Sequence, residues 1–285
     1  MKLVVTGARG MLGQAVIAGA RERDHEVIAL GHCDLDVADA GAVESAIAAA
    51  RPAAIINCAA WTDVDGAQDR EFEATAVNGT GAGNLAQAAH AAGARIVHVS
   101  TDYVFPGDAT EPYIESDAVG PRSAYGRSKL TGERGVSAAC TDHAIVRTAW
   151  LFGSDGSNFV DTMLKLGAER DELRVVDDQV GCPTWTGHLA PALVLLAEGG
   201  ATGLFHAAGG GRCSWFELAR AAIERAGLSC AVTPTTTAEF PRPAPRPAFS
   251  VLGTERGNDA ITLPAWQDGL DAFLAARAAT PEVKK

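Results

Sequence analysis

Short apolar runs alternate with longer alanine-rich stretches of helical period over the first half of the chain. Five buried strands are predicted by the runs KLVVTG, HEVIAL, AAIINCAA, ARIVHVST and HAIVRTAWLFG. The stretches between them, such as MLGQAVIAGARERD and DAGAVESAIAAARP, predict helices. Buried strands that alternate with helices predict an α/β fold with a doubly wound parallel sheet (a Rossmann fold), in which ligands bind beyond the carboxyl ends of the strands.

This rhythm changes after residue 150. The segments SNFVDTMLKLGAER, HLAPALVLLAEGG and SWFELARAAIERAG predict helices, and GLFHAAGG predicts a strand that returns to the sheet. The proline-rich segment 234–250 is expected to be extended, and the tail TPEVKK to fray. We therefore expect a dinucleotide-binding domain formed by residues 1–150 and about 189–208, and a smaller α/β substrate domain formed by residues 151–188 and 209–285.

Composition and charge bound the class of protein. The chain has 285 residues, of which 47% are hydrophobic and 21% charged, as in ordinary globular proteins. Its net charge of −11 disfavours non-specific binding to nucleic acid or to an anionic membrane surface. The six cysteines include no C-x-x-C pair, so metal-ligand spacing is absent and no metal site is expected. No leader segment or membrane-spanning apolar run is recognisable, which favours a cytoplasmic protein with reduced thiols.

The segment VVTGARGMLG places Gly7, Gly10 and Gly13 between the first predicted strand and the first predicted helix. The G-x-x-G-x-x-G spacing by itself is a weak signal, and a purely structural turn is the alternative interpretation. The strand–turn–helix context favours a dinucleotide site, because glycines let the backbone approach a pyrophosphate at a helix N-terminus. The other predicted cofactor residues of this turn are Arg9, Met11 and Leu12.

The end of the second strand bears on the choice of nicotinamide cofactor. A carboxylate there would bind a ribose 2′-hydroxyl and favour NADH, but Gly31 and His32 follow the strand directly. Arg9 lies nearby in the glycine turn, so a 2′-phosphate would not be repelled, and the sequence favours NADPH. Asp36 and Val37 are candidates for the adenine edge. The remaining predicted cofactor residues, after the third strand, are Ala59 and Ala60.

Tyr125 and Lys129 are separated by one helical turn in the segment SAYGRSKLTGE. Residues i and i+4 share a helix face, so the phenol and the ammonium can cooperate in proton transfer, although a solvated surface pair has the same spacing. Thr101 ends the fourth strand, on the side of the sheet where ligands bind. Together with the glycine turn, Thr101 favours a catalytic role for Tyr125 and Lys129.

The order of glycine turn, strand-end threonine and Tyr-x-x-x-Lys resembles the extended branch of the short-chain dehydrogenase/reductase superfamily. The segments STDYVFPG, YGRSKLTGE, VDDQVGCPT and RPAFSVL occur in the order seen in the dTDP-4-dehydrorhamnose reductase family. The resemblance implies reduction of the 4-keto group of dTDP-4-dehydro-L-rhamnose to dTDP-L-rhamnose by NADPH or NADH. It also implies a catalytic triad of Thr101, Tyr125 and Lys129, and substrate contacts from Thr62, Tyr103, Trp150, Asn158 and Arg246.

The implied chemistry explains these residue types. Hydride arrival at a ketone carbon builds negative charge on the oxygen, which needs a proton and a hydrogen-bond donor already in place. We expect Tyr125 to donate the proton, Lys129 to lower the pKa of Tyr125, and Thr101 to orient the carbonyl. Trp61 and His98 are expected to be core residues, and the Asp177–Asp178 pair to be part of a loop.

Two alternatives stay open at this point. The first is another dTDP-4-keto-6-deoxysugar reductase, for example of the dihydrostreptose type, because only residues lining the sugar pocket separate such enzymes. The second is a non-catalytic regulatory subunit that binds NADP, although an intact triad argues against it. The sequence itself does not reveal the oligomeric state; the resemblance allows a homodimer, because members of the family often dimerise.

Overall fold

The computed structural model describes residues 1–279, so the predicted fraying of the tail TPEVKK lies outside the described residues. A six-stranded parallel sheet in the order β10-β5-β4-β3-β1-β2 forms its centre. The predicted strands are confirmed, including the returning strand β10, which pairs with β5. The strands are β1 (Lys2–Thr6), β2 (Glu26–Leu30), β3 (Ala54–Asn57), β4 (Arg95–Thr101), β5 (His143–Thr148) and β10 (Gly203–His206).

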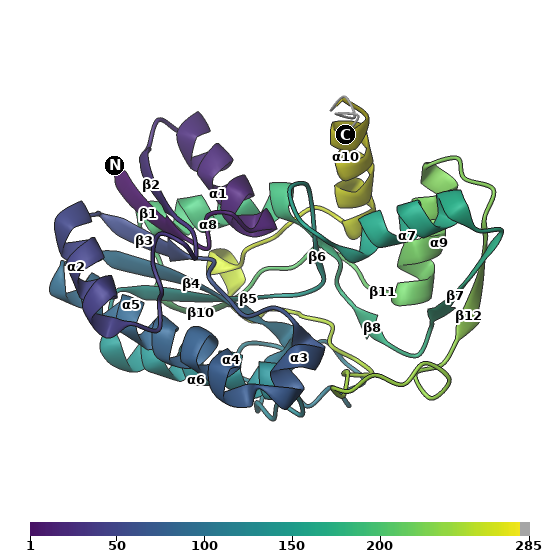
Figure 1. The fold of residues 1–285 in the computed structure, drawn as a ribbon, viewed down its shortest axis with the longest axis horizontal. Helices are drawn as coiled ribbons and strands as arrows, with labels where there is room; N and C mark the ends of the chain where they lie inside the picture. The colour runs from purple at the N-terminus through teal and green to yellow at the C-terminus, as the bar shows by residue number, and fades with distance from the viewer. Residues whose placement is uncertain (280–285) are drawn as a thin grey trace.

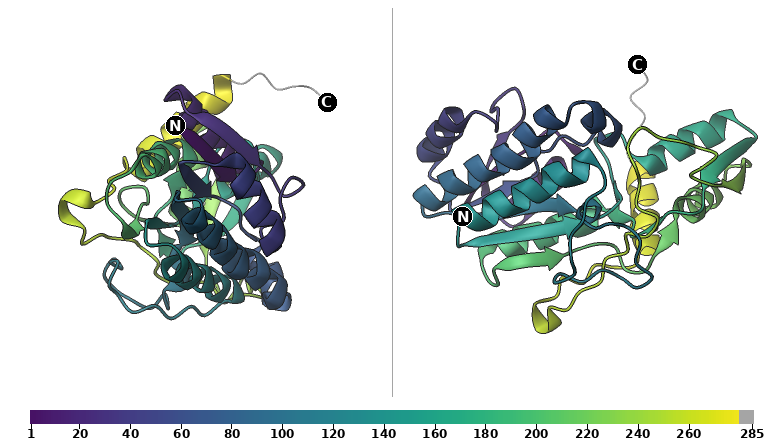
Figure 2. Two further views of the ribbon diagram at one scale, coloured as in Figure 1. Left: turned by 90° about the vertical axis from the view of Figure 1, so that its left-hand side faces the viewer. Right: turned by 90° about the horizontal axis from the view of Figure 1, so that it is seen from below.

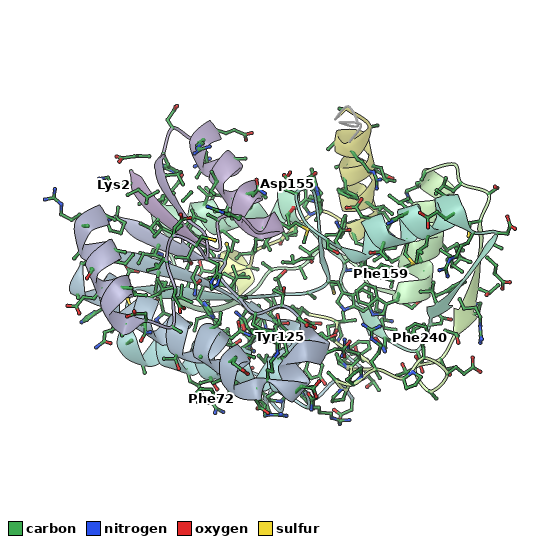
Figure 3. The ribbon with its side chains drawn as sticks, viewed as in Figure 1. Lys2, Phe72, Tyr125, Asp155, Phe159 and Phe240 are labelled. Atoms are coloured by element: carbon green, nitrogen blue, oxygen red, sulfur yellow. The ribbon has the colours of Figure 1, made fainter. Side chains whose placement is uncertain are left out.

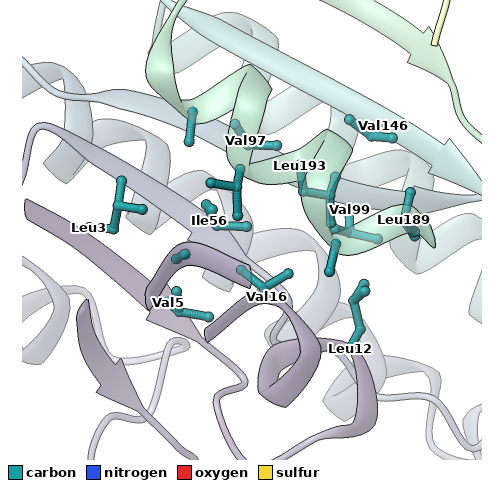
Figure 4. Close-up of a cluster of buried hydrophobic side chains, with 14 of the residues drawn as sticks. Leu3, Val5, Leu12, Val16, Ile56, Val97, Val99, Val146, Leu189 and Leu193 are labelled. Atoms are coloured by element: carbon teal, nitrogen blue, oxygen red, sulfur yellow. The ribbon is translucent and has the colours of Figure 1, made fainter. Parts of the chain in front are cut away.

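Helices cover both faces of this sheet (Figure 1). The first face packs against α1 (Met11–Glu22) and α8 (Thr186–Glu198), and Figure 4 shows side chains of α1 and α8 meeting those of the strands. The second face packs against α2 (Ala40–Ala50), α5 (Gly81–Ala91) and α6 (Ala124–Ala139), of which α5 and α6 run side by side in Figure 2. Burial on both faces explains why the strands read as continuous apolar runs, and the predicted α/β fold is confirmed.

The topological switch point of the sheet lies between β1 and β3. The chain moves from β1 outward to β2, and then returns to place β3, β4, β5 and β10 on the other side of β1. Loops that follow the two neighbouring strands therefore diverge, and ligands of such sheets bind in the crevice between them. The glycine turn follows β1, at this switch point.

A smaller group of elements lies beyond the carboxyl ends of the strands (Figure 1). In it, α7 (Phe159–Glu169) and α9 (Trp215–Arg225) pack together against the parallel pair β7 (Glu172–Val176) and β12 (Ala231–Thr235). The predicted helices α7 and α9 are confirmed. The last described helix, α10 (Trp266–Ala279), packs on Phe152 and the first turn of α9 through a separate apolar cluster.

Several short elements complete the chain. The helical stretch that precedes β4 is divided into α4 (Glu71–Thr75), a π-helical turn (Ala76–Thr80) and α5. The others are α3 (Val64–Asp69), the 3-10 turns Asp102–Val104 and Gly257–Asp259, and the two-residue strands β6 (Leu151–Phe152), β8 (Val180–Gly181), β9 (Thr184–Trp185) and β11 (Cys213–Ser214). Within the described part of the chain, no helix has the length and apolar character that crossing a membrane requires.

The proline-rich segment 234–250 is less uniform than expected. Its first residues complete β12, but the N–H groups of Glu239 and Phe240 then donate to the carbonyl of Thr236 and form a turn. The residues between Thr235 and Pro241 include no proline, so their N–H groups are free to close this turn. Farther on, Phe249 forms single bridges to Asp108 and Val180.

Candidate active site

The glycine turn after β1 packs against the backbone that follows β3. Gly7 has a φ of 66°, and a Cβ at this position would lie 2.5 Å from the carbonyl carbon of Cys58. A Cβ at Gly13 would lie 2.2 Å from the carbonyl oxygen of Gly7. Side chains are excluded at both positions, so the N-terminus of α1 stays bare beside the switch point. This cradle fits the pyrophosphate of a dinucleotide.

The end of β2 holds a carboxylate that the sequence did not indicate. Gly31 and His32 do follow the strand directly, but the turn folds Asp34 back, and its Oδ2 accepts a hydrogen bond from the N–H of Gly31 at 2.9 Å. Nη2 of Arg9 lies 3.6 Å from the same oxygen. This place therefore offers a guanidinium, which suits a 2′-phosphate, beside a carboxylate, which suits a 2′-hydroxyl.

The other predicted cofactor residues take different positions around the switch point. The side chains of Leu12 and Val37 are buried in the two cores of the sheet, so only their backbone could meet a ligand. Asp36 is exposed, and its Oδ1 accepts from the N–H of Ala38. The N–H of Ala59 donates to Oδ1 of Asn57 at 3.0 Å, which fixes the chain where it leaves β3.

The structure brings Thr101, Tyr103 and Tyr125 together where β4 ends and α6 begins (Figure 3 marks Tyr125). The buried hydroxyl of Thr101 donates to Oδ1 of Asp102 at 3.0 Å and accepts from the N–H of Tyr103 at 3.2 Å. The rings of Tyr103 and Tyr125 meet edge to face, with their centroids 5.6 Å apart. Burial raises the pKa of Tyr125 to about 12, although hydrogen bonding by Thr101 lowers it.

Lys129 lies one turn below Tyr125 and is buried. Its Nζ donates to the carbonyl of Val99 at 2.6 Å. Burial lowers the pKa of Lys129 to about 8, whereas the charge of Glu133 raises it. The pKa of Tyr125 is raised rather than lowered as expected, because desolvation of the phenol is the largest influence on it.

Asp102 is a buried residue next to Thr101 that sequence reasoning missed. Burial raises its pKa to about 6, while the hydrogen bond from the Thr101 hydroxyl lowers it. Its Oδ2 has no hydrogen-bond partner among the residues that the structure describes. The position directly after a strand-end threonine was the available signal, but the sequence does not reveal that the side chain turns inward.

Asn78 is a second buried residue that sequence reasoning missed. It lies in the π-helical turn, a feature that often marks functional sites. Its Nδ2 donates to Oγ of Ser128 at 2.8 Å and to the carbonyl of Trp61 at 3.1 Å, and its Oδ1 accepts from the N–H of Trp61 at 2.8 Å. Oγ of Ser128 in turn donates to the carbonyl of Tyr125 at 2.7 Å. Asn78 thus fixes the loop after β3 on the first turn of α6.

Arg246 is held close to the two tyrosines by an ion pair. Its Nη1 donates to Oδ1 of Asp65 in α3 and to the carbonyl of Ala244, both at 2.8 Å. Arg242 pairs with the other oxygen of Asp65 at 2.9 Å. The charge of Arg246 also acts on the Tyr103 phenol, so the guanidinium lies near this tyrosine.

Trp150 has both faces of its indole covered. It stacks on Trp215 at 3.5 Å between ring centroids with an interplanar angle of 4°. A Cβ at Gly181 would lie 2.5 Å from a ring carbon of Trp150. The φ of Trp150 is 47°, an unusual conformation for a bulky residue. A ligand could therefore meet the edge of this indole but not its faces, and its sugar contact stays a prediction.

The two remaining predicted substrate residues have contrasting surroundings. Asn158 caps α7: its Oδ1 accepts from the N–H of Asp161 at 3.0 Å, and its Nδ2 donates to the carbonyl of Gly153 at 2.9 Å. Thr62 is exposed in the loop after β3. Their substrate contacts also stay predictions.

The residues given plainer interpretations are placed as follows. His98 is a buried core residue, as expected, and its Nδ1 is 3.0 Å from Nδ2 of Asn57. Trp61 is only half-buried, and the guanidinium of Arg70 lies 4.4 Å from its ring centroid. Asp177 accepts from Ser214, as expected of a loop residue.

The parallel sheet, the glycine turn at its switch point and the Thr101, Tyr125 and Lys129 group at the strand ends define a short-chain dehydrogenase/reductase. Within this class, the chain belongs to the family whose model is described as the RmlD substrate binding domain, which matches residues 1–279.

Relatives and solved structures resemble the chain over nearly its whole length. A dTDP-4-dehydrorhamnose reductase of Streptomyces griseus is 45% identical over 290 residues, which cover 98% of this chain and 95% of the relative. A probable dTDP-4,6-dihydroxy-2-methyloxan-3-one 4-ketoreductase of Streptomyces antibioticus is 43% identical over 279 residues, covering 96% and 95%. The crystal structure of a Bacillus anthracis dTDP-4-dehydrorhamnose reductase in complex with NADP has a TM-score of 0.94 and 37% identity, covering 96% of this chain and 99% of that one.

Proposed function

We propose that the chain reduces the 4-keto group of dTDP-4-dehydro-L-rhamnose to give dTDP-L-rhamnose, with NADPH as the preferred cofactor and NADH as the alternative. The reaction is supported by the full-length similarity to relatives named dTDP-4-dehydrorhamnose reductase. The cofactor is supported by the NADP of the Bacillus anthracis structure and by the bare glycine cradle. The observation that carries the proposal is the phenol of Tyr125 packed beside Thr101 at the strand ends.

Three residues of this chain, Thr101, Tyr125 and Lys129, would together deliver a proton to the substrate. NADPH, when bound, supplies the hydride. Tyr125, whose pKa of about 12 keeps it protonated at neutral pH, gives its proton to the sugar oxygen as that oxygen becomes an alkoxide, a stronger base than phenolate. Thr101 turns its hydroxyl from Oδ1 of Asp102 to donate a hydrogen bond to the same oxygen, and the buried ammonium of Lys129 stabilises the phenolate that results.

We also propose the domain division predicted from the sequence. In its support, the side chains of α8 belong to the core of the sheet, whereas α7 and α9 have apolar clusters of their own. A cytoplasmic location is supported by the cysteines, all six of which are free thiols.

An assay of turnover tests this function against its alternatives. The chain is mixed with NADPH or NADH and a panel of dTDP-4-keto-6-deoxy sugars, and the absorbance of the reduced nicotinamide is followed. We expect the highest kcat/KM with dTDP-4-dehydro-L-rhamnose and NADPH. Turnover confined to another sugar would support a different 4-ketoreductase. The name of the Streptomyces antibioticus relative describes such an enzyme. NADP binding without turnover of any sugar would support a regulatory subunit.

Replacement of Arg246 should weaken binding of the sugar nucleotide. We expect Arg246→Ala to raise KM for the substrate about 10- to 100-fold, because losing a charged hydrogen bond removes ~1.5–3 kcal/mol. Arg242→Ala is the matched control, since Arg242 pairs with the same Asp65 but its side chain is 50% exposed, against 14% for Arg246. The measurement is the steady-state kinetics of both variants. An equal rise of the two KM values would refute the contact between Arg246 and the sugar nucleotide.

A further inference from the structure

The end of β4 is hydrogen-bonded to successive turns of α6. The carbonyl of Val99 accepts from Nζ of Lys129 at 2.6 Å, and Oγ of Ser100 donates to Oε1 of Glu133 at 2.6 Å. Tyr125, Lys129 and Glu133 follow one another at intervals of one helical turn, so they lie along one face of α6. These hydrogen bonds fix the register of the helix that carries Tyr125 on the strand that carries Thr101.

Glu133 is held in this position by Arg147 of β5. Nε of Arg147 donates to Oε1 at 2.9 Å, and Nη2 donates to Oε2 at 2.8 Å. Only 7% of the Glu133 side chain and 4% of the Arg147 side chain are exposed. A buried ion pair of this kind is seldom favoured over an apolar pair for stability alone, so its presence beside Lys129 calls for another reason.

The titratable groups around Lys129 come from its own helix and from the neighbouring strands. Burial raises the pKa of the Cys58 thiol, after β3, to about 12, and lowers that of His98, in β4, well below its usual range. Tyr125, on the same helix, is also neutral because burial raises its pKa. Among the described groups whose charges act on Lys129, Glu133 is the carboxylate, and it is ion-paired with Arg147.

We propose that Glu133 is a positioning residue for the reduction: held by Arg147 and Ser100, its carboxylate keeps the Lys129 ammonium charged and in register beneath Tyr125. The inference rests on the proposed function and adds a residue that acts through Lys129 rather than on the substrate.

The pH profile of the reaction tests this role. A reaction that needs the ammonium of Lys129 is fully active below the pKa of Lys129, about 8, and loses activity as the pH rises through it. Without the carboxylate, the pKa falls further, so the alkaline limb of kcat/KM should move to lower pH in Glu133→Gln. A downward shift of one pKa unit would reduce activity at pH 8 by about fivefold relative to the wild type.

Companion variants separate charge from folding. Glu133→Gln leaves Arg147 buried without an anion and could unfold, so Glu133→Gln combined with Arg147→Met provides a second form without the carboxylate. We expect the alkaline limb to be lowered there as well. Glu133→Asp retains the carboxylate and should keep the limb at its wild-type pH. An unchanged limb in both forms that lack the carboxylate would overturn the proposal.

A direct titration separates this inference from the proposed function. Lys129 is one of five lysines, so its pKa can be followed by NMR in protein labelled at lysine, without any turnover. We expect the pKa of Lys129 to be lower in Glu133→Gln than in the wild type. Equal values would overturn the role of Glu133 even if the enzyme reduced its substrate, whereas a lowered pKa with no sugar reduced would count against the proposed function alone.

Discussion

Tyr125→Phe is expected to lower kcat by about 100- to 10,000-fold, because it removes the proton donor of a general-acid step. The fold should survive, since phenylalanine keeps the ring that packs edge to face on Tyr103. The measurements are kcat with dTDP-4-dehydro-L-rhamnose, the melting temperature and the Kd for NADPH. Only kcat should change substantially.

Tyr103→Phe is the matched control for this variant. Tyr103 packs against Tyr125 and lies near Arg246, so its hydroxyl can contribute to binding but is not the expected donor. We expect a loss in kcat/KM of about tenfold at most, the scale of one hydrogen bond. If Tyr103→Phe abolished turnover and Tyr125→Phe did not, the proton donor would be wrongly assigned.

Gly13→Ala is expected to weaken NADPH binding by at least 100-fold, or about 2.8 kcal/mol. Its new Cβ would lie 2.2 Å from the carbonyl oxygen of Gly7, so the turn after β1 must move and the cradle closes. Titration of nicotinamide fluorescence measures the binding, and thermal unfolding shows whether the chain is still folded.

Gly19→Ala provides the control within the same helix. A Cβ at Gly19 would meet nothing within 4 Å. Since alanine is the better helix former by ~1 kcal/mol, this variant should be as stable as the wild type or more so, and should bind NADPH normally. Equal NADPH affinity in Gly13→Ala and Gly19→Ala would show that the glycine turn is not the cofactor site.

The sheet could be predicted because its information is local. Runs such as AAIINCAA and ARIVHVST are apolar at nearly every position, which is typical of strands covered on both faces, and glycines mark the turn after β1. Tyr125 and Lys129 could be placed on one face because the helical period fixes their relation. In each case, neighbours in the sequence determine the outcome.

The surroundings of the site could not be predicted because they depend on contacts between distant segments. Asp65 meets Arg246, and Trp150 meets Trp215, only after the whole chain has folded. The rise in the pKa of Tyr125 follows from burial by such segments, which spacing does not reveal. The conformation of a single turn also matters, since the turn after β2 brings the carboxylate of Asp34 back to the strand end.

The most direct measurement of the central claim uses NADPH in which both hydrogens at C4 of the nicotinamide are deuterium, together with dTDP-4-dehydro-L-rhamnose. Product NMR then locates the label. The account predicts deuterium at C4 of dTDP-L-rhamnose in the wild type, and almost none formed in Tyr125→Phe over the same time. Unlabelled product, or labelled product formed equally fast by Tyr125→Phe, would contradict it.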